Sequence, residues 1–214
     1  MNDKLDFKKE YKDLYLPGKK PMLIEVPPIR YLMADGTGEP NGESYQRALE
    51  LLYALTFTIK MSKMGSRPIE GYFEYVVPPL EGLWACGEQG FFLSRNEWKW
   101  TSMIRQPDFV TQEVFDWACE EVQKKKGFDV SRARLEIWDE GLCAQLMHTG
   151  PYATEQASID RLTAFIAENG LRDECGRIRR HHEIYLGDPR RTAPERLRTV
   201  IRHPVAAAEK TGNE

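Results

Sequence analysis

Glu183 stands inside a segment, 181–186, that alternates as a buried β-strand does. A carboxylate there points either to water, at little cost, or into a cavity, where burial raises its pKa unless a cation or donor lies nearby. Glu74 occupies a similar step in the earlier segment 73–77, and this recurrence favours the inward orientation. Glu183 is therefore the leading candidate for a functional acid.

A second candidate is Tyr152, which follows Gly150 and Pro151 at an expected strand-to-helix turn. Its phenol either stands at the mouth of a pocket, where it can donate a proton, or packs against the first helical turn. Trp98 and Trp100 lie two residues apart and so share one strand face, which can clamp a planar ligand or belong to the core. The side chains predicted to contact a ligand are Trp98, Trp100, Trp138, Tyr185, Tyr75 and Phe91, with further rings at Tyr72, Trp84 and Phe92.

Other chemistries find less support in the sequence. His181 and Glu183 share a strand face, but no third ligand has a recognisable spacing, so no metal site is predicted. A G-x-S-x-G motif is missing, and none of the four cysteines has a histidine close to it in sequence. Gly36-x-Gly38 lacks the third glycine and the lysine of a phosphate-binding loop. We therefore expect no cofactor.

Composition limits the partners and the compartment. The 214 residues are 41% hydrophobic, enough for one substantial domain, and the net charge of −3 suggests no nucleic-acid groove. The basic run 124–126 falls where a helix would end, where cations suit the helix dipole. No stretch approaches the roughly 18 apolar residues of a membrane span, and 1–20 has no apolar signal region. A cytoplasmic location with reduced thiols is expected.

Three blocks recur in the same order along the chain. Leu32-Met33 followed by Gly36 returns as Leu146-Met147 followed by Gly150; Glu74 in 73–77 returns as Glu183 in 182–186; and 104–107 returns as 201–204. This recurrence predicts a duplicated supersecondary unit. Two paired copies leave a seam between them, where a pocket for a small molecule can form.

Local patterns supply the elements of each copy. The first copy is predicted to contain strands 22–26 and 30–34, helix 45–59 capped by Asn41, strand 71–77, and a hairpin of 91–93 with 98–104. The second is predicted to contain strands 135–138 and 142–147, a helix capped by Thr154 and ended by Gly170, and strands 181–186 and 197–202.

The predicted fold class is α+β, with duplicated βαββ units related by a pseudo-two-fold axis around a central cleft. The sheet is expected to be mostly antiparallel, with helices on one face and the free face as a ligand floor. We divide the chain into an extended arm (1–20), a single domain (21–205) and a disordered tail (206–214). Within the domain, the first repeat is 21–107, a linker helix covers 111–126, and the second repeat is 133–205.

Several of these segments together resemble the GyrI-like small-molecule-binding family. The resemblance rests on the turn 33–38, the strand Glu183-Ile184-Tyr185 and the run 194–199, and it covers 21–205. It is closest to the stand-alone branch, for which 98–109 and 201–204 are characteristic. The fold implied by the resemblance is the same pair of βαββ units around a cleft.

The resemblance also implies a function. In multidrug-sensing activators with this domain, a buried Glu matching Glu183 pairs with cationic aromatic drugs, and related stand-alone members hydrolyse cyclopropanoid DNA-alkylating natural products of the yatakemycin and duocarmycin type. For this chain it implies a hydrolase with Glu183 and Tyr152 as the working pair. In such chemistry Glu183 would act as general base on water and Tyr152 would polarise the substrate oxygen.

Two function classes stay open from the sequence. The first is a hydrolase that detoxifies planar aromatic xenobiotics by adding water. The second is a non-catalytic module that sequesters cationic aromatic ligands or serves as an effector-binding domain. In both, the partner is a planar aromatic small molecule, without nucleic acid or membrane. The sequence does not determine the oligomeric state.

Overall fold

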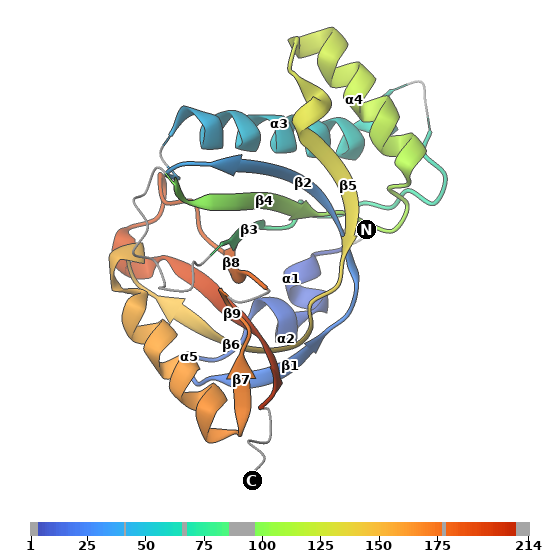
Figure 1. Ribbon diagram of the computed structural model, residues 1–214. Coiled ribbons are helices and arrows are strands. Elements are labelled where there is room, and N and C mark those ends of the chain that lie inside the picture. Colours follow the sequence, from blue (N-terminus) through green and yellow to red (C-terminus); the bar gives the residue numbers. More distant parts are fainter. Residues whose placement is uncertain (1–3, 41, 66–67, 86–96, 177–178, 209–214) are drawn as a thin grey trace, which may run out of the picture.

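One curved antiparallel sheet dominates the computed structural model, which describes residues 4–40, 42–65, 68–85, 97–176 and 179–208 (Figure 1). Its strands run in the order β1-β6-β9-β8-β3-β4-β2-β5, with β7 paired to β9. Their bounds are β1 Met22–Val26, β2 Ile29–Thr37, β3 Leu80–Trp84, β4 Lys99–Arg105, β5 Ala133–Trp138, β6 Gly141–Thr149, β7 Leu171–Asp173, β8 His181–Tyr185 and β9 Arg198–Ala207. The predicted α+β class and antiparallel sheet are confirmed.

The sheet bends until its two ends are joined by short connections. β1 pairs with β6 at one end and β2 pairs with β5 at the other. Only Pro27 and Pro28 separate β1 from β2, and only Asp139 and Glu140 separate β5 from β6. Prolines lack the N–H that would continue the ladder, so the long strand breaks and turns there. The sheet therefore has an inner, concave face and an outer face.

Two long helices cover the outer face, and a third packs beside them. α3 (Glu43–Lys60) lies on β2 and β4, and α5 (Gln156–Glu168) lies on β6 and β9, while α4 (Gln112–Lys126) contacts α3 (Figure 1). Their apolar residues recur at helical spacing and are buried, as at Leu52, Leu55 and Ile59 of α3. α4 is the predicted helix between the copies.

Strand registers confirm two of the three repeated blocks. Leu32 of β2 lies opposite Ile104 of β4, as Leu146 of β6 lies opposite Ile201 of β9. The units β2-α3-β3-β4 and β6-α5-β8-β9 meet where β3 pairs with β8. The duplication is therefore real in the backbone as well as in the sequence.

The predicted equivalence of Glu74 and Glu183, which formed one of the three repeated blocks, is wrong. Leu80 lies opposite Ile104, and Glu183 lies opposite Ile201, so the counterpart of Glu183 in the first copy is Leu80. Glu74 lies outside the sheet and forms an ion pair with Lys63. The residues 71–77 form no strand beyond one isolated bridge from Tyr75, because the strand begins only after the Pro78-Pro79 pair.

Residues near the termini also differ from expectation. The segment 1–20 contains α1 (Phe7–Glu10) and α2 (Lys12–Tyr15) where an extended arm was expected, and Ala206–Ala207 extend β9 where a disordered tail was expected. α5 is N-capped by Glu155, while Thr154 belongs to the preceding short 3-10 helix Tyr152–Thr154. The predicted strand 91–93, the N-cap Asn41 and the end of the tail, 209–214, lie outside the described residues.

The inner face of the sheet is occupied by α1 and α2, so it cannot serve as the expected ligand floor. Arg202 Nη2 donates to the Leu14 carbonyl at 2.9 Å, and the Tyr15 hydroxyl donates to Glu81 Oε1 at 3.2 Å. These groups are buried. The opposite, outer face is the one that α3 and α5 cover. No helix of the described residues is long and apolar enough to cross a membrane.

Candidate functional site

Glu183 lies at the centre of the outer face, on β8, where the two repeats meet. Gly82 of β3 is its cross-strand neighbour. Its Oε1 is 2.9 Å from His181 Nε2, and its Oε2 accepts a hydrogen bond of 2.7 Å from the Tyr185 hydroxyl. The side chain is 13% exposed. Burial opposes ionisation, but the hydrogen bonds from His181 and Tyr185 outweigh it and hold the pKa of Glu183 below its ordinary value.

Tyr185 and Trp84 hold this carboxylate in place. Trp84 Nε1 donates to the Tyr185 hydroxyl at 2.9 Å, and that hydroxyl donates in turn to Glu183. A Cβ atom at Gly82 would lie 3.0 Å from both the Trp84 Nε1 and the Tyr185 oxygen. The missing side chain at Gly82 is what lets the two rings close over β3 beside Glu183.

Tyr152 reaches the same place from the short 3-10 helix that precedes α5. Its ring meets the ring of Tyr185 edge-on, with centroids 6.1 Å apart, and the residue is 40% exposed. Burial of the phenol and the negative charges of Glu155 and Glu183 raise the pKa of Tyr152 to about 12. Tyr152 therefore keeps its proton at neutral pH and can donate it in a hydrogen bond from the solvent side of Glu183.

A second carboxyl, Glu155, lies one turn beyond Tyr152. It is buried, and its Oε1 has no hydrogen-bond partner among the described residues. Burial and the charge of Glu183 raise the pKa of Glu155 to about 9. One carboxyl of the pair is thus ionised and the other neutral, the arrangement that assigns base and acid roles in many active sites.

Behind Glu183, two histidines continue the hydrogen-bond chain away from solvent. His181 Nδ1 is 2.8 Å from His203 Nε2, and His203 Nδ1 is 2.6 Å from Asp173 Oδ2. An ionised carboxylate only accepts, so the protons toward Glu183 and Asp173 are assigned to the rings. Burial lowers the pKa of His203 despite the hydrogen bond to Asp173.

The predicted aromatic residues divide between the site and the rest of the core. Trp98 meets Trp84 edge-on at 5.9 Å, next to the Tyr185 pair. Trp100 is only 1% exposed, lies over Gly36, where a Cβ would clash with its ring, and packs against Tyr45. It is a core residue and cannot stack on a ligand.

Two more predicted ligand contacts lie elsewhere. Trp138 is opposite Ile29 at the far end of β5, on the sheet face of Tyr31, and so faces away from Glu183. Tyr75 is fully buried among Phe7, Phe73 and Phe109. Phe91 lies outside the described residues.

The inner face carries a separate buried polar cluster, which the sequence did not reveal. His182 bridges Glu140 Oε2 (2.8 Å) and Glu81 Oε2 (3.0 Å), and Arg202 Nη1 donates to Glu140 Oε2 at 3.0 Å. Burial works against ionisation of Glu140, but His182 and Arg202 bring its pKa down to about 2. Alternation along β8 sends His182 inward and His181 with Glu183 outward.

Sequence reasoning also missed Glu155, Asp173, Cys175 and His203 as neighbours of the site. Glu155 carried a usable signal, because it follows Tyr152 by three residues and so shares its face of a helical turn. Asp173, Cys175 and His203 carried none, because only the pairing of β7 and β8 with β9 brings them together.

Comparison with known proteins identifies the family of this chain. The family model of the GyrI-like small molecule binding domain matches residues 111–206 of the sequence. A structure described as a hydrolase from Listeria innocua is 48% identical, with a TM-score of 0.88, covering 95% of this chain and 100% of that one. The chain belongs to the GyrI-like family.

Further solved structures share the fold. An uncharacterized conserved protein from Listeria innocua is 50% identical, with a TM-score of 0.91 and the same coverage of 95% and 100%. The EcmrR C-terminal domain shares the fold at 13% identity and a TM-score of 0.53, covering 88% of this chain and 98% of that one. A comparison with curated proteins finds no match.

Proposed function

We propose that this GyrI-like protein binds planar aromatic xenobiotics and hydrolyses cyclopropanoid DNA-alkylating compounds in the cytoplasm by adding water. The observation that carries the proposal is an ionised, largely buried Glu183 beside a protonated, partly exposed Tyr152. The similarity to a structure described as a hydrolase supports an enzymatic role.

The reaction needs a base next to the attacking water and a proton donor next to the carbonyl oxygen of the substrate. Water attacks the cyclopropane methylene carbon and gives its proton to Glu183; the ring C–C bond breaks, and its electron pair moves through the dienone to the carbonyl oxygen. That oxygen receives the proton of Tyr152, which becomes a phenolate. Glu183 then releases its proton to solvent and the phenolate takes one up, so both groups are restored and the net change is the addition of one water. Each step of this acid–base kind is worth about 10²- to 10⁴-fold in rate.

Glu183 can act as base although both of its oxygens are engaged. Each carboxylate oxygen has two lone pairs, so Oε1 and Oε2 can each accept one bond beyond those from His181 and Tyr185. These two bonds fix the carboxylate against rotation, which preserves the attack geometry. Tyr185 and Trp98 would hold the flat body of the substrate, with Trp84 and Trp100 supporting them from the core.

The test is incubation of the purified protein with a duocarmycin-type cyclopropanoid, followed by mass spectrometry of the small molecule. We expect a product heavier by one water, and we expect Glu183→Gln and Tyr152→Phe each to slow its formation by about 10² or more. Glu74→Gln is the matched control, because Glu74 pairs with Lys63 outside the sheet, and it should keep full activity.

Two outcomes would contradict the proposal. Recovery of the compound intact from its complex with the wild-type protein would indicate a binding module without turnover. Equal losses in Glu74→Gln and Glu183→Gln would remove Glu183 from the chemistry. Circular dichroism of each variant establishes that the fold is retained.

A further inference from the structure

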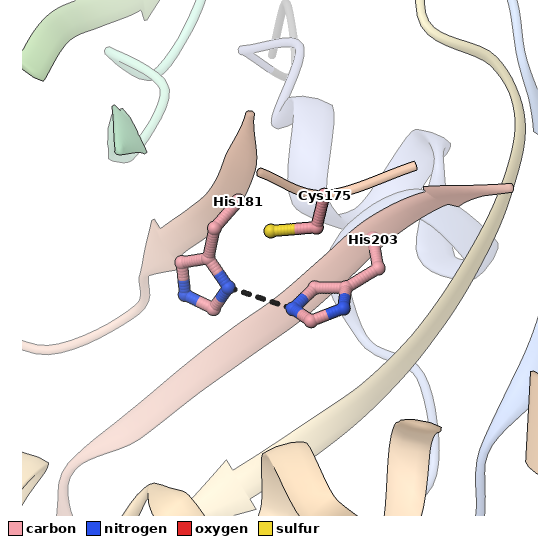
Figure 2. Close-up of side chains that lie close together, drawn as sticks. All are labelled: Cys175, His181 and His203. Atoms are coloured by element: carbon pink, nitrogen blue, oxygen red, sulfur yellow. Dashed lines mark hydrogen bonds between the residues drawn. The ribbon is translucent and has the colours of Figure 1, made fainter. Parts of the chain in front are cut away.

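Three potential metal ligands converge on the buried side of Glu183. Figure 2 shows Cys175, His181 and His203 with their side chains turned toward one another. The ligand atoms of these three residues all lie within 4.8 Å of one another. His181 opens β8, His203 lies in β9, and Cys175 lies in the turn after β7, so the cluster joins three separate segments.

The ligand set suits a particular class of ion. Thiolate and imidazole together favour zinc and similar soft or borderline divalent ions over calcium or magnesium, which prefer oxygen. In a tetrahedral zinc site the Zn–S distance of about 2.3 Å and Zn–N distances of about 2.0–2.1 Å place ligand atoms about 3.3–3.6 Å apart. The facing nitrogens of His181 and His203, now 2.8 Å apart, need to separate by only about half an ångström.

Both histidines already have the outer partners that metal-bound histidines use. His181 Nε2 bonds to Glu183 Oε1 at 2.9 Å, and His203 Nδ1 bonds to Asp173 Oδ2 at 2.6 Å. A carboxylate on the distal ring nitrogen fixes the tautomer and turns the other nitrogen toward the ion. Here both distal nitrogens are used in this way, so both lone pairs that remain face the same point.

The same contacts also limit the number of protons between the two rings. With one N–H spent on each carboxylate, the two facing nitrogens can share a single bridging proton, which makes the pair of rings cationic. A divalent cation in place of that proton satisfies both lone pairs. Both rings are buried, so it is favourable for each of these lone pairs to have a partner.

Asp173 also fixes the third ligand. Its Oδ1 accepts a hydrogen bond of 2.8 Å from the Cys175 backbone N–H, while its Oδ2 holds His203. The Glu174 N–H bonds to the Pro204 carbonyl at 2.9 Å, which ties the turn to β9. One carboxylate therefore sets the positions of the cysteine and of a histidine together.

We propose that Cys175, His181 and His203 form a binding site for a zinc-type divalent cation, with Asp173 and Glu183 as its outer partners. No step of the proposed hydrolysis passes through the ion, so binding of the cation can be tested without that reaction. Its place behind Glu183 gives it a positioning role: an ion on His181 Nδ1 polarises the Nε2–H and strengthens the bond that orients the carboxylate.

The test uses the full chain, stripped with a chelator and titrated with Co²⁺ and then Zn²⁺. We expect one equivalent of Co²⁺ to bind with a thiolate-to-cobalt absorption band in the near ultraviolet, which Zn²⁺ abolishes by displacement. Cys175→Ser should remove the band, whereas Cys119→Ser, on α4, should retain it. Asp173→Asn should weaken binding about 10- to 100-fold.

Other results would contradict the proposed metal site. Absence of binding by the wild-type chain, or a band that survives in Cys175→Ser, would overturn the site. Zn²⁺ should also raise the melting temperature of the wild type and of Cys119→Ser, and a rise of the same size in Cys175→Ser would place the ion elsewhere. None of these readouts depends on hydrolysis, so failure of the metal site and failure of the proposed function can be told apart.

Discussion

At the scale of single residues, the site is defined by two carboxyls in opposite protonation states. Glu183 is ionised because His181 and Tyr185 donate to it, and Glu155 is neutral because it is buried beside that charge without a donor for Oε1. The negative charge is therefore confined to the carboxylate that has been fixed in position. Tyr152, three residues before Glu155 in sequence and partly exposed, keeps its phenolic proton at neutral pH.

The neutral state of Glu155 has a measurable effect on stability. Its pKa is about 9 in the folded protein, above the ordinary value of 4.5, so its contribution is complete below about pH 4.5 and is lost as the pH rises toward 9. Glu155→Gln, which cannot ionise, should therefore gain stability over the wild type by more than about 1 kcal/mol at pH 8 and by little at pH 4. Urea unfolding at both pH values measures this difference; an equal difference at both would contradict the assignment.

Gly82 tests the fixing of the carboxylate by the rings above β3. In Gly82→Ala the new methyl group would meet Trp84 Nε1 and the Tyr185 hydroxyl at 3.0 Å, so both must shift away from Glu183. We expect the rate constant for ring opening, kcat, to fall by up to roughly 10². Gly18→Ala, where the added atom meets only the Lys20 backbone nitrogen at an ordinary contact distance of 3.9 Å, is the control and should leave kcat unchanged.

At the scale of elements, β8 separates two polar systems by alternation alone. His181, Glu183 and Tyr185 face outward to the candidate site, while His182 faces inward to Glu140 and Glu81. The inner cluster holds α2 against the sheet through Arg202 and the Leu14 carbonyl. The inner hydrogen bonds therefore stabilise the fold, and the residues around Glu183 on the outer face do not have to.

Removal of Arg202 should show that structural role. Arg202→Ala leaves Glu140 buried without its cation, and we expect the free energy of unfolding to fall by about 3–5 kcal/mol. Arg190→Ala, at a pair whose arginine side chain is 85% exposed, should change it by less than about 1 kcal/mol. Chemical denaturation compares the two, and similar small losses would refute the structural role of the cluster.

The elements also show why the sequence predicted some features and missed others. The helices were predictable because their apolar residues recur at 3.6-residue spacing, and Glu183 was found because it interrupts an apolar strand. β3 was missed because Pro78-Pro79 indicates the end of an element, and the strand starts immediately beyond it. The Asp173–His203–His181 chain was unpredictable because its members depend on the register of β7, β8 and β9.

At the scale of the whole molecule, duplication gives one site and not two. The pseudo-two-fold axis passes between β3 and β8, and the position that carries Glu183 in the second copy carries Leu80 in the first. The first copy contributes Trp84 and Gly82 in place of an acid, and it contributes α3, while the second copy contributes α5 (Figure 1). The two halves therefore differ at the seam, with Glu183 and Tyr152 from the second copy on one side and Trp84 from the first copy on the other.

The most direct test of this account follows oxygen in a single turnover. With excess protein in H₂¹⁸O and a duocarmycin-type cyclopropanoid, a Glu183 that activates water puts the label on the former cyclopropane carbon of the first product formed. A direct attack by the carboxylate would instead leave that first product unlabelled and place ¹⁸O in the Glu183 peptide. We predict a labelled product and an unlabelled peptide. The reverse pattern, or no product at all, would contradict the proposal that Glu183 activates water.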